Sequence, residues 1–368
     1  MPTPAQRYVP RTRRAIRSLL QLHPAPWRWK EGLEAGLALG LPLGLFTVLG
    51  HQGWGLQAAL GAFTALYGAS LSRRDRMDLL PLVAAGLVAA AGLGVAGAGS
   101  IWLSNACLVV GSAAACAVTL GARLGPPGPM MFVLVMAVST HLTRPKELGG
   151  AGLPGLPLVG LVAAGAALAY LVIVAPLLLP SVRRRHGPPT GLRVLYPQVK
   201  LDREAALTAL RVVVGVLITC LISRPLGAHR TYWVVLSAVA VLQSSASRQL
   251  TTIRGLQRMI GTLLGIGVFE LLTLRQPSGL WLVALLMLLQ AATEVVVARN
   301  YALALLFITP MALLNSTAGH PGSTLLSVEG RVFDTLLGAT VALLLFWLSE
   351  WLVRRLPLLT QDTPASAP

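Results

Sequence analysis

The chain has 368 residues, of which 55% are hydrophobic and only 12% are charged. An ordinary soluble domain carries about 25% charged residues, and a soluble core of this size cannot bury such a surplus of apolar side chains. The formal net charge is +17, but no basic stretch is organised as a module that reads a nucleic-acid groove. The composition indicates a polytopic helical membrane protein and argues against a soluble enzyme or a nucleic-acid-binding protein.

Apolar stretches of about 17–25 residues, the length that crosses a bilayer as a helix, recur along the whole chain. We therefore predict an all-α fold with about 12 transmembrane helices. Their approximate ranges are 33–50, 54–71, 79–98, 100–121, 129–142, 156–180, 205–223, 231–247, 259–274, 279–298, 300–317 and 332–352. The range 129–142 is the shortest of them and its limits are the least defined.

The basic residues lie mostly between the apolar stretches, on one side of the predicted membrane. By the positive-inside rule, this distribution places both termini in the cytoplasm, with the chain in a bacterial inner membrane. The basic loops then face anionic lipid headgroups. Few basic residues are expected on the outer side: Arg144, Lys146, Arg224, Arg230, Arg275 and Arg331.

A polar segment divides the chain near its middle. It contains three consecutive arginines, Gly-Pro-Pro and a further proline, a composition typical of a linker. About six predicted helices lie on each side, and the two halves begin alike, which suggests a parallel duplication. We predict a basic cytoplasmic tail at 1–30, a membrane half at 31–180, a cytoplasmic linker at 181–203, a second membrane half at 204–353 and a cytoplasmic tail at 354–368.

The second half contains the pattern Arg-x-x-(Gly/Asp)-Thr-Leu-Leu-Gly twice, beginning at Arg258 and at Arg331. Each copy opens a predicted helix, and three helices separate equivalent points. An odd number of crossings reverses the direction of the chain, so the two copies enter the membrane from opposite sides. This is the arrangement of an inverted repeat, in which a substrate site is expected near the pseudo-twofold axis.

Within each copy, the arginine, the threonine and the last glycine share one face of a helix, because they lie at positions i, i+4 and i+7. A guanidinium and a hydroxyl on one face suit an anion, and arginine inside a membrane helix usually faces a hydrated path. The candidate substrate-binding residues are Arg258, Thr262, Arg331, Thr335 and Arg211. The alternatives are close helix packing for the glycines and snorkelling to the interface for the arginines.

Three carboxylates within the predicted helices are candidates for proton coupling: Asp334, Glu270 and Glu294. A buried carboxyl group that binds and releases a proton could couple outward movement of an anion to inward movement of protons. The sequence does not choose among the three. Arg331 and Asp334 lie three residues apart, so a structural ion pair is the alternative interpretation for them.

These motifs carry a resemblance. Residues 200–355 resemble the fusaric acid resistance (FUSC) membrane domain of the aromatic acid exporter superfamily, to which plant aluminium-activated malate transporters are more distantly related. The matching positions are Leu210-Arg211, Tyr232-Trp233, Arg258-x-x-Gly261-Thr262-x-x-Gly265, Asn300-Tyr301 and Arg331-x-x-Asp334-Thr335-x-x-Gly338. The resemblance implies export of organic, often aromatic, carboxylates, with Arg211, Arg258 and Arg331 at the positions of the family's characteristic arginines.

No cofactor, metal site or catalytic motif is predicted. The three cysteines, Cys107, Cys116 and Cys220, have spacings that fit neither a disulfide framework nor a metal site, and no phosphate-binding loop, His-Glu-x-x-His or Gly-x-Ser-x-Gly motif occurs. The histidines His51, His141, His229 and His320 are expected to be solvated residues of loops or helix ends.

Three functions remain, in decreasing order of support. The first is a secondary exporter or anion channel for organic, especially aromatic, carboxylates. The second is a membrane protein with a structural or envelope-assembly role and no transport, and the third is a membrane-embedded enzyme. The expected partners are an organic anion and membrane lipids, with a homodimer left open.

Overall fold

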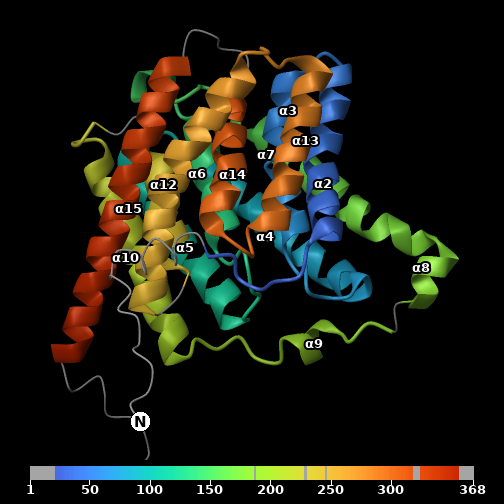
Figure 1. Cartoon of the computed structure of the whole chain (residues 1–368), viewed down its shortest axis with the longest axis horizontal. Helices are drawn as coiled ribbons and strands as arrows, with labels where there is room; N and C mark the ends of the chain where they lie inside the picture. Colours follow the sequence, from blue (N-terminus) through green and yellow to red (C-terminus); the bar gives the residue numbers. More distant parts are fainter. Residues whose placement is uncertain (1–20, 186–187, 228–229, 245–246, 318–323, 356–368) are drawn as a thin grey trace, which may run out of the picture.

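The structure is a computed structural model that describes residues 21–185, 188–227, 230–244, 247–317 and 324–355. In these ranges the chain forms α-helices and short 3₁₀ helices without a strand, which confirms the all-α prediction. The helices form one bundle, and a linker that carries α8 (Pro180–Arg185) and α9 (Leu192–Leu195) runs across one end of it (Figure 1). We call this end of the bundle the linker end.

Within the described ranges, eight helices are long and apolar enough to cross a membrane. They are α2 (Trp29–Val48), α4 (Arg73–Gly97), α5 (Ile101–Gly121), α7 (Gly155–Val174), α10 (Arg203–Ser223), α12 (Arg248–Thr273), α13 (Gly279–Val296) and α15 (Thr324–Arg355). Three apolar helices are shorter: α6 (Met130–Thr143), α11 (Thr231–Leu242) and α14 (Tyr301–Thr317). The protein is a polytopic helical membrane protein, but the predicted count of 12 transmembrane helices is wrong.

The segment 54–71 departs furthest from the prediction of a continuous helix. It forms the short α3 (Gln52–Ala58) and the 3₁₀ helix η1 (Gly61–Leu66) instead. Gly61 lies so close to the carbonyl oxygen of Val162 in α7 that a side chain would not fit. The chain then turns at Gly68, whose φ of +66° is a conformation that glycine adopts without strain. Apolar composition correctly indicates burial here, but it does not report whether a helix is continuous.

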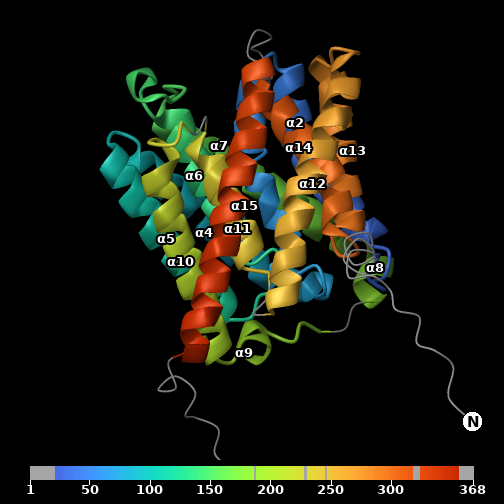
Figure 2. The ribbon, with the colours of Figure 1, turned by 60° about the vertical axis from the view of Figure 1, so that its left-hand side comes forward.

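The stretches 29–178 and 203–355 present helices in the same order of length: long, short, long, long, short, long. In the first stretch α4 packs against α6 and α7, and in the second α12 packs against α14 and α15. Between the stretches, α2 packs against α13 and α5 against α10 (Figure 2). The two stretches share one packing scheme, although neither contains six full-length spans. The exact domain limits stay a prediction.

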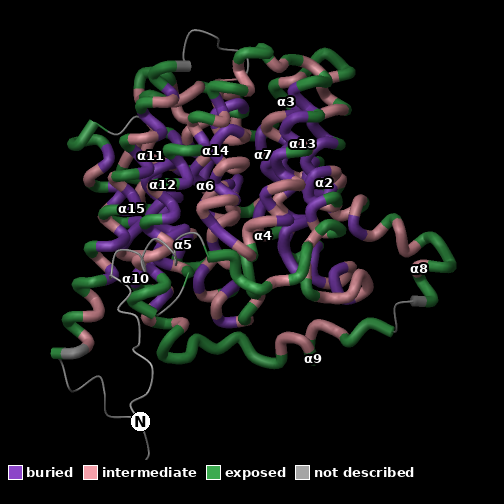
Figure 3. The backbone as a smooth tube through the Cα atoms, in the orientation of Figure 1, coloured by how far each residue is buried: buried purple, intermediate pink, exposed green. Residues whose placement is uncertain are grey.

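Helix α11 is enclosed by the rest of the bundle. Every residue from Trp233 to Leu242 is buried, and α11 packs against α15, α10, α6 and α12. Buried residues are concentrated in the middle of the bundle, whereas the linker is largely exposed (Figure 3). Side chains on the outer helix faces, such as Leu103, Leu171 and Leu288, are exposed and apolar, as contact with lipid requires.

Small residues allow α2 and α13 to approach closely. A Cβ atom at Gly32 would lie 2.8 Å from the carbonyl oxygen of Ala291, and one at Gly36 would lie 2.9 Å from that of Met287. Because a side chain at either glycine would force the helices apart, glycine in α2 serves helix packing.

Candidate functional site

Arg258 of α12 and Arg331 of α15, the first residues of the two repeated motifs, both reach α11. Arg258 donates a hydrogen bond from Nη2 to Oγ of Ser237 at 3.2 Å, and the Arg331 guanidinium lies 4.9 Å from the ring centroid of Trp233. Trp233 and Ser237 are one helical turn apart, about 6 Å along α11. Arg331 also lies within electrostatic range of Arg258. The two motifs therefore converge on one buried helix.

Tyr301, the first residue of α14, contacts two cations. Its hydroxyl oxygen accepts a hydrogen bond of 2.7 Å from Nη1 of Arg258. The guanidinium of Arg254, one turn earlier on α12, lies 3.5 Å from the centroid of the tyrosine ring. Tyr301 is 3% exposed, so both contacts are formed away from water, where a cation–π contact is strongest.

Arg230, which precedes α11, lies beside the same tryptophan. Its guanidinium is 4.9 Å from the Trp233 ring centroid, and its Nη1 donates to the Tyr232 hydroxyl at 3.0 Å. The backbone N–H of Arg230 donates to the fully buried carboxylate of Asp334 at 2.7 Å. Asp334 thereby holds the start of α11. The ion pairs formed among described residues do not include one between Arg331 and Asp334.

We call Arg230, Arg254, Arg258 and Arg331 the arginine cluster. Among the described residues, Asp334 is the only carboxylate in contact with it. The other partners are neutral hydroxyl groups and aromatic rings. Removing a guanidinium from water costs several kcal/mol when no opposite charge compensates it. The cluster therefore has an excess of positive charge that a bound anion would compensate.

Several buried side-chain polar atoms without a hydrogen-bond partner in the described part of the chain lie at the same place, and others, such as Nε of Arg76 and Arg211, lie elsewhere in the bundle. The atoms at the arginine cluster include Nε of Arg254, Arg258 and Arg331, and Oγ1 of Thr262 and Thr335. Each threonine is 1% exposed and lies one turn after the arginine of its own motif. Buried polar atoms are normally hydrogen-bonded, so these groups are available to a bound anion or to water. The structure thus brings together four of the five predicted substrate-binding residues.

The glycines of the two motifs serve packing, as their alternative interpretation predicts. A Cβ atom at Gly261 would lie 2.8 Å from the carbonyl oxygen of Ala302, and one at Gly265 would lie 2.6 Å from that of Leu305, both on α14. Gly338 lies equally close to the backbone of α11. These contacts hold α12 and α15 against the helices that supply the tyrosine and the tryptophan.

Arg211 is not part of this site. Its Nη2 donates to Oε1 of Glu350 on α15 at 2.7 Å, and its guanidinium lies 4.4 Å from the ring centroid of Phe346. Because its charge is already paired by a carboxylate, the geometry supports a structural tie between α10 and α15. The prediction of Arg211 as a substrate-binding residue finds no support here.

The three candidate proton-coupling carboxylates lie in different places. Glu270 is exposed on α12. Glu294 on α13 lies 4.0 Å from Arg28, measured between Oε2 and Nη1. Asp334 alone among them lies at the arginine cluster. Proton coupling by any of the three stays a prediction.

Sequence reasoning assigned no role to several residues of the site. Arg254, Ser237 and Arg230 belong to it only because α11, α12 and α14 pack together. Two aromatic residues of the site, Trp233 and Tyr301, could have been found from the sequence, because the dipeptides Tyr232-Trp233 and Asn300-Tyr301 are among the positions that match the family. No group of three or more metal-ligating side chains occurs in the described ranges, and the three cysteines are free thiols.

Comparison with known proteins finds a family model that is similar to the part of the chain containing this site. Residues 217–345 match the family model described as fusaric acid resistance protein-like, and this range contains the whole arginine cluster. The uncharacterized membrane protein YvaC of Bacillus subtilis (strain 168) is 32% identical over 155 residues, which cover 39% of this chain and 25% of that protein. An uncharacterized protein of Haemophilus influenzae is 30% identical over 158 residues, covering 42% of this chain and 21% of that protein.

The chain thus spans about a quarter of the length of these curated relatives. No solved structure matches it. The family match confirms the resemblance inferred from the motifs over residues 217–345, which include every quoted motif except Leu210-Arg211. This part of the multi-pass membrane protein is similar to the fusaric acid resistance protein-like family.

Proposed function

We propose that this protein carries organic carboxylates out of a bacterial cell across the inner membrane, as a secondary exporter or an anion channel. The observation that carries the proposal is the arginine cluster, in which Arg258 and Arg331 are buried. Its four positive charges exceed the negative charge of Asp334, the carboxylate in contact with it among the described residues. Ionisable groups in this setting typically mark an ion or substrate path. The proposal makes the protein a transporter rather than an enzyme.

The neighbours of the arginines favour an organic, particularly an aromatic, carboxylate. A carboxylate accepts paired hydrogen bonds from a guanidinium, and the rings of Trp233 and Tyr301 lie directly beside the guanidinium groups. An aromatic ligand would find both a charged partner and a ring to stack on. The name of the matching family, fusaric acid resistance protein-like, agrees with this substrate class.

The cluster extends along the axis of the bundle. Arg254 lies one turn nearer the linker end of α12 than Arg258, and Arg230 lies at the opposite end of α11 (Figure 2). Guanidinium groups therefore follow one another in the direction in which an anion would move. We propose that the linker end is cytoplasmic, since it carries Arg183, Arg184 and Arg193. A thiol label that reached the linker from outside intact cells would contradict this orientation.

The proposal is tested by carboxylate efflux from proteoliposomes. Arg258→Gln and Arg331→Gln should each lower efflux of labelled aromatic carboxylates about tenfold or more, since a hydrogen bond to a charged group contributes ~1.5–3 kcal/mol. Arg275→Gln, which removes an exposed charge at the end of α12, is the matched control. Repeating the assay with an imposed pH gradient separates proton-coupled export from a channel.

A structural role without transport is the competing function. It is favoured by the hydrogen bonds that Arg258 already makes to Tyr301 and Ser237, which join α12, α14 and α11. Under that function, Arg258→Gln would lower thermal stability, and wild-type vesicles would show no efflux above protein-free vesicles.

A further inference from the structure

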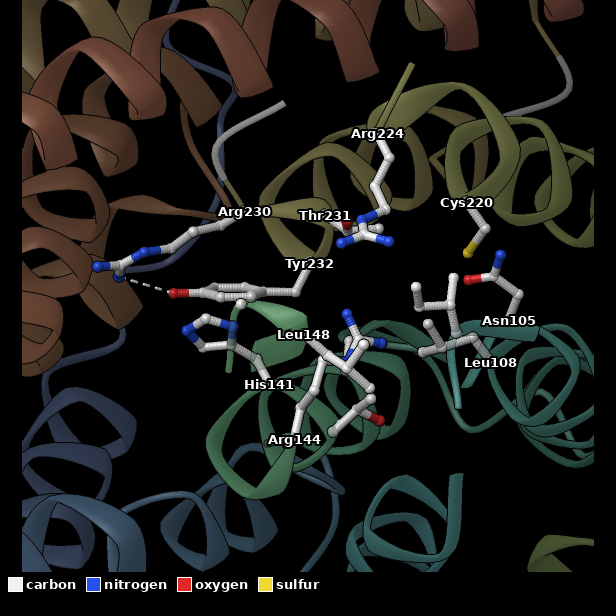
Figure 4. A pocket seen from close by; sticks show the side chains of 14 residues that line it. Asn105, Leu108, His141, Arg144, Leu148, Cys220, Arg224, Arg230, Thr231 and Tyr232 are labelled. Carbon is white, nitrogen blue, oxygen red and sulfur yellow. Dashed lines mark hydrogen bonds between the residues drawn. The ribbon is translucent and has the colours of Figure 1, made fainter. Parts of the chain in front are cut away.

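A separate cavity lies at the end of the bundle opposite the linker. Helix α10 begins beside the linker and its 21 residues extend about 31 Å, so Arg224 at its end is on the far side of the bundle. The cavity has a volume of about 240 Å³ and lies among the ends of α5, α6 and α10 and the start of α11. Figure 4 shows its lining side chains.

The cavity is positively charged. Arg144, Arg224 and Arg230 line it together with His141, and none of the described residues that line it is acidic. The guanidinium groups of Arg144 and Arg224 point toward one another across the space (Figure 4). Nε of Arg144 is buried and has no hydrogen-bond partner in the described part of the chain. Burial and then the nearby charge of Arg224 lower the pKa of Arg144.

Aromatic and apolar side chains also line the cavity. The rings of His141 and Tyr232 are tilted relative to each other, with their centroids 5.2 Å apart, and Leu108 and Leu148 contribute apolar surface. The histidine, expected to be solvated, is partly buried beside this tyrosine. The side chain of Arg230 points away from the other two arginines, toward its bond with the Tyr232 hydroxyl (Figure 4). Tyr232 therefore lies between the guanidinium group of Arg230 and those of Arg144 and Arg224 (Figure 4).

These arginines lie where the positive-inside rule disfavours them. Arg144, Arg224 and Arg230 are three of the few basic residues predicted on the outer side of the membrane, and folding brings all three to one cavity. Topology gives no reason for positive charge there. A bound anion gives a reason for the charge of Arg144 and Arg224, because neither forms an ion pair with a carboxylate among the described residues.

We propose that this cavity is a second ligand site, which binds an organic carboxylate at the end of the bundle opposite the linker. The carboxylate lies between Arg144 and Arg224, and its hydrocarbon part lies against Tyr232 and His141. A volume of 240 Å³ equals about eight water molecules at ~30 Å³ each, enough for a small aromatic acid. This proposal takes only the class of its ligand, an organic carboxylate, from the proposed function. The test below measures binding and does not require transport.

The test is protection of a cysteine inside the cavity. With the three native cysteines replaced by serine, Asn105→Cys, in the lining of the cavity, is exposed to an anionic thiol reagent in the full-length protein. Benzoate should slow its modification severalfold, and neutral benzyl alcohol should not. Trp102→Cys, on the same helix but 75% exposed to the surroundings, is the matched control and should be unaffected.

Arginine variants identify the groups that bind. Arg144→Gln or Arg224→Gln should raise the benzoate concentration needed for protection about tenfold or more. Arg144→Lys, which keeps the charge but loses the paired donors, should have a smaller effect. Arg224 is exposed, so Arg224→Gln should fold normally. It can therefore test the proposal even if Arg144→Gln does not fold. Absence of protection, or protection that survives both glutamine variants, overturns the proposal, as does equal protection by inorganic phosphate.

The outcome is independent of the proposed transport. Lost efflux in Arg258→Gln without protection at Asn105→Cys would overturn the second site alone. Protection by benzoate in a protein whose efflux does not depend on Arg258 would retain the second site and overturn the proposed function.

Discussion

Arginines near the start of α4 and along α12 show how the same packing scheme carries two different electrostatic arrangements. In the first stretch, Arg73 and Arg76 both donate to the carboxylate of Glu34 on α2. Arg73 also donates to the carbonyl oxygen of Ile173 and Arg76 to that of Ala65, at 2.7 and 2.6 Å. A carboxylate and backbone oxygens thus accept hydrogen bonds from the terminal nitrogens of both guanidinium groups, and the buried Nε of Arg76 is left without a partner among the described residues.

On α12 the partners are of another kind. Arg254 and Arg258 contact a tyrosine and a serine, which are neutral. The first arrangement ties helices together and leaves little charge for a ligand. The second leaves positive charge in the interior, which is costly without an anion. The difference teaches that an arginine inside a helical bundle indicates a substrate path only when its neighbours do not neutralise it.

The largest expected effect lies in the neutralised region. Glu34→Gln leaves two partly or fully buried guanidinium groups without their carboxylate and should lower the free energy of unfolding by about 3–5 kcal/mol. Thermal unfolding in detergent measures this loss. Glu147→Gln, at an exposed position, is the control. If Arg258→Gln destabilises the protein as much as Glu34→Gln does, the distinction between the two regions fails.

A smaller effect is expected from Asp334→Asn in the charged region. The amide oxygen can still accept the hydrogen bond from the Arg230 backbone, so stability should fall by no more than ~1 kcal/mol. The loss of negative charge should raise the apparent affinity for the transported carboxylate severalfold, because Asp334 no longer competes with it for the arginines. Transport kinetics and thermal unfolding measure the two quantities. A strongly destabilised Asp334→Asn protein rescued by Arg331→Gln would instead show a structural ion pair.

The smallest effect concerns an exposed pair, which serves as a reference for both regions. Asp202 accepts hydrogen bonds from the backbone N–H of Ala205 and from Arg123, at 2.8 and 2.9 Å. These bonds lower its pKa from the ordinary value of 3.8. A lowered pKa stabilises the fold above pH ~4 and the gain is lost as pH falls further. Asp202→Asn should flatten this acid-side slope of thermal stability, because it removes the small gain at neutral pH and changes little at low pH, where the wild-type carboxyl group is already protonated.

The convergence of Arg258 and Arg331 could be predicted from the sequence. Counting the helices between the two copies of the motif shows that the copies enter the membrane from opposite sides. That Arg254 and Ser237 belong to the same site could not be predicted, since it depends on how α11 and α14 pack. The pairing of Arg211 with Glu350 could not be predicted for the same reason, since the two residues are 139 positions apart in the sequence. Hydropathy overcounted the spans because it measures apolarity, and a segment such as 54–71 is apolar without being one helix.

The shortness of α11 has an electrical consequence. Its 12 residues extend about 18 Å, whereas the hydrocarbon core of a bilayer is ~30 Å thick. The field along α11 is steeper than in the lipid only to the extent that the membrane potential falls over this shorter distance. Each elementary charge that crosses gains or loses about 2.3 kcal/mol per 100 mV. In a cell with a negative interior, an anion that follows the arginines along α11 would be driven outward over this short distance by the potential itself.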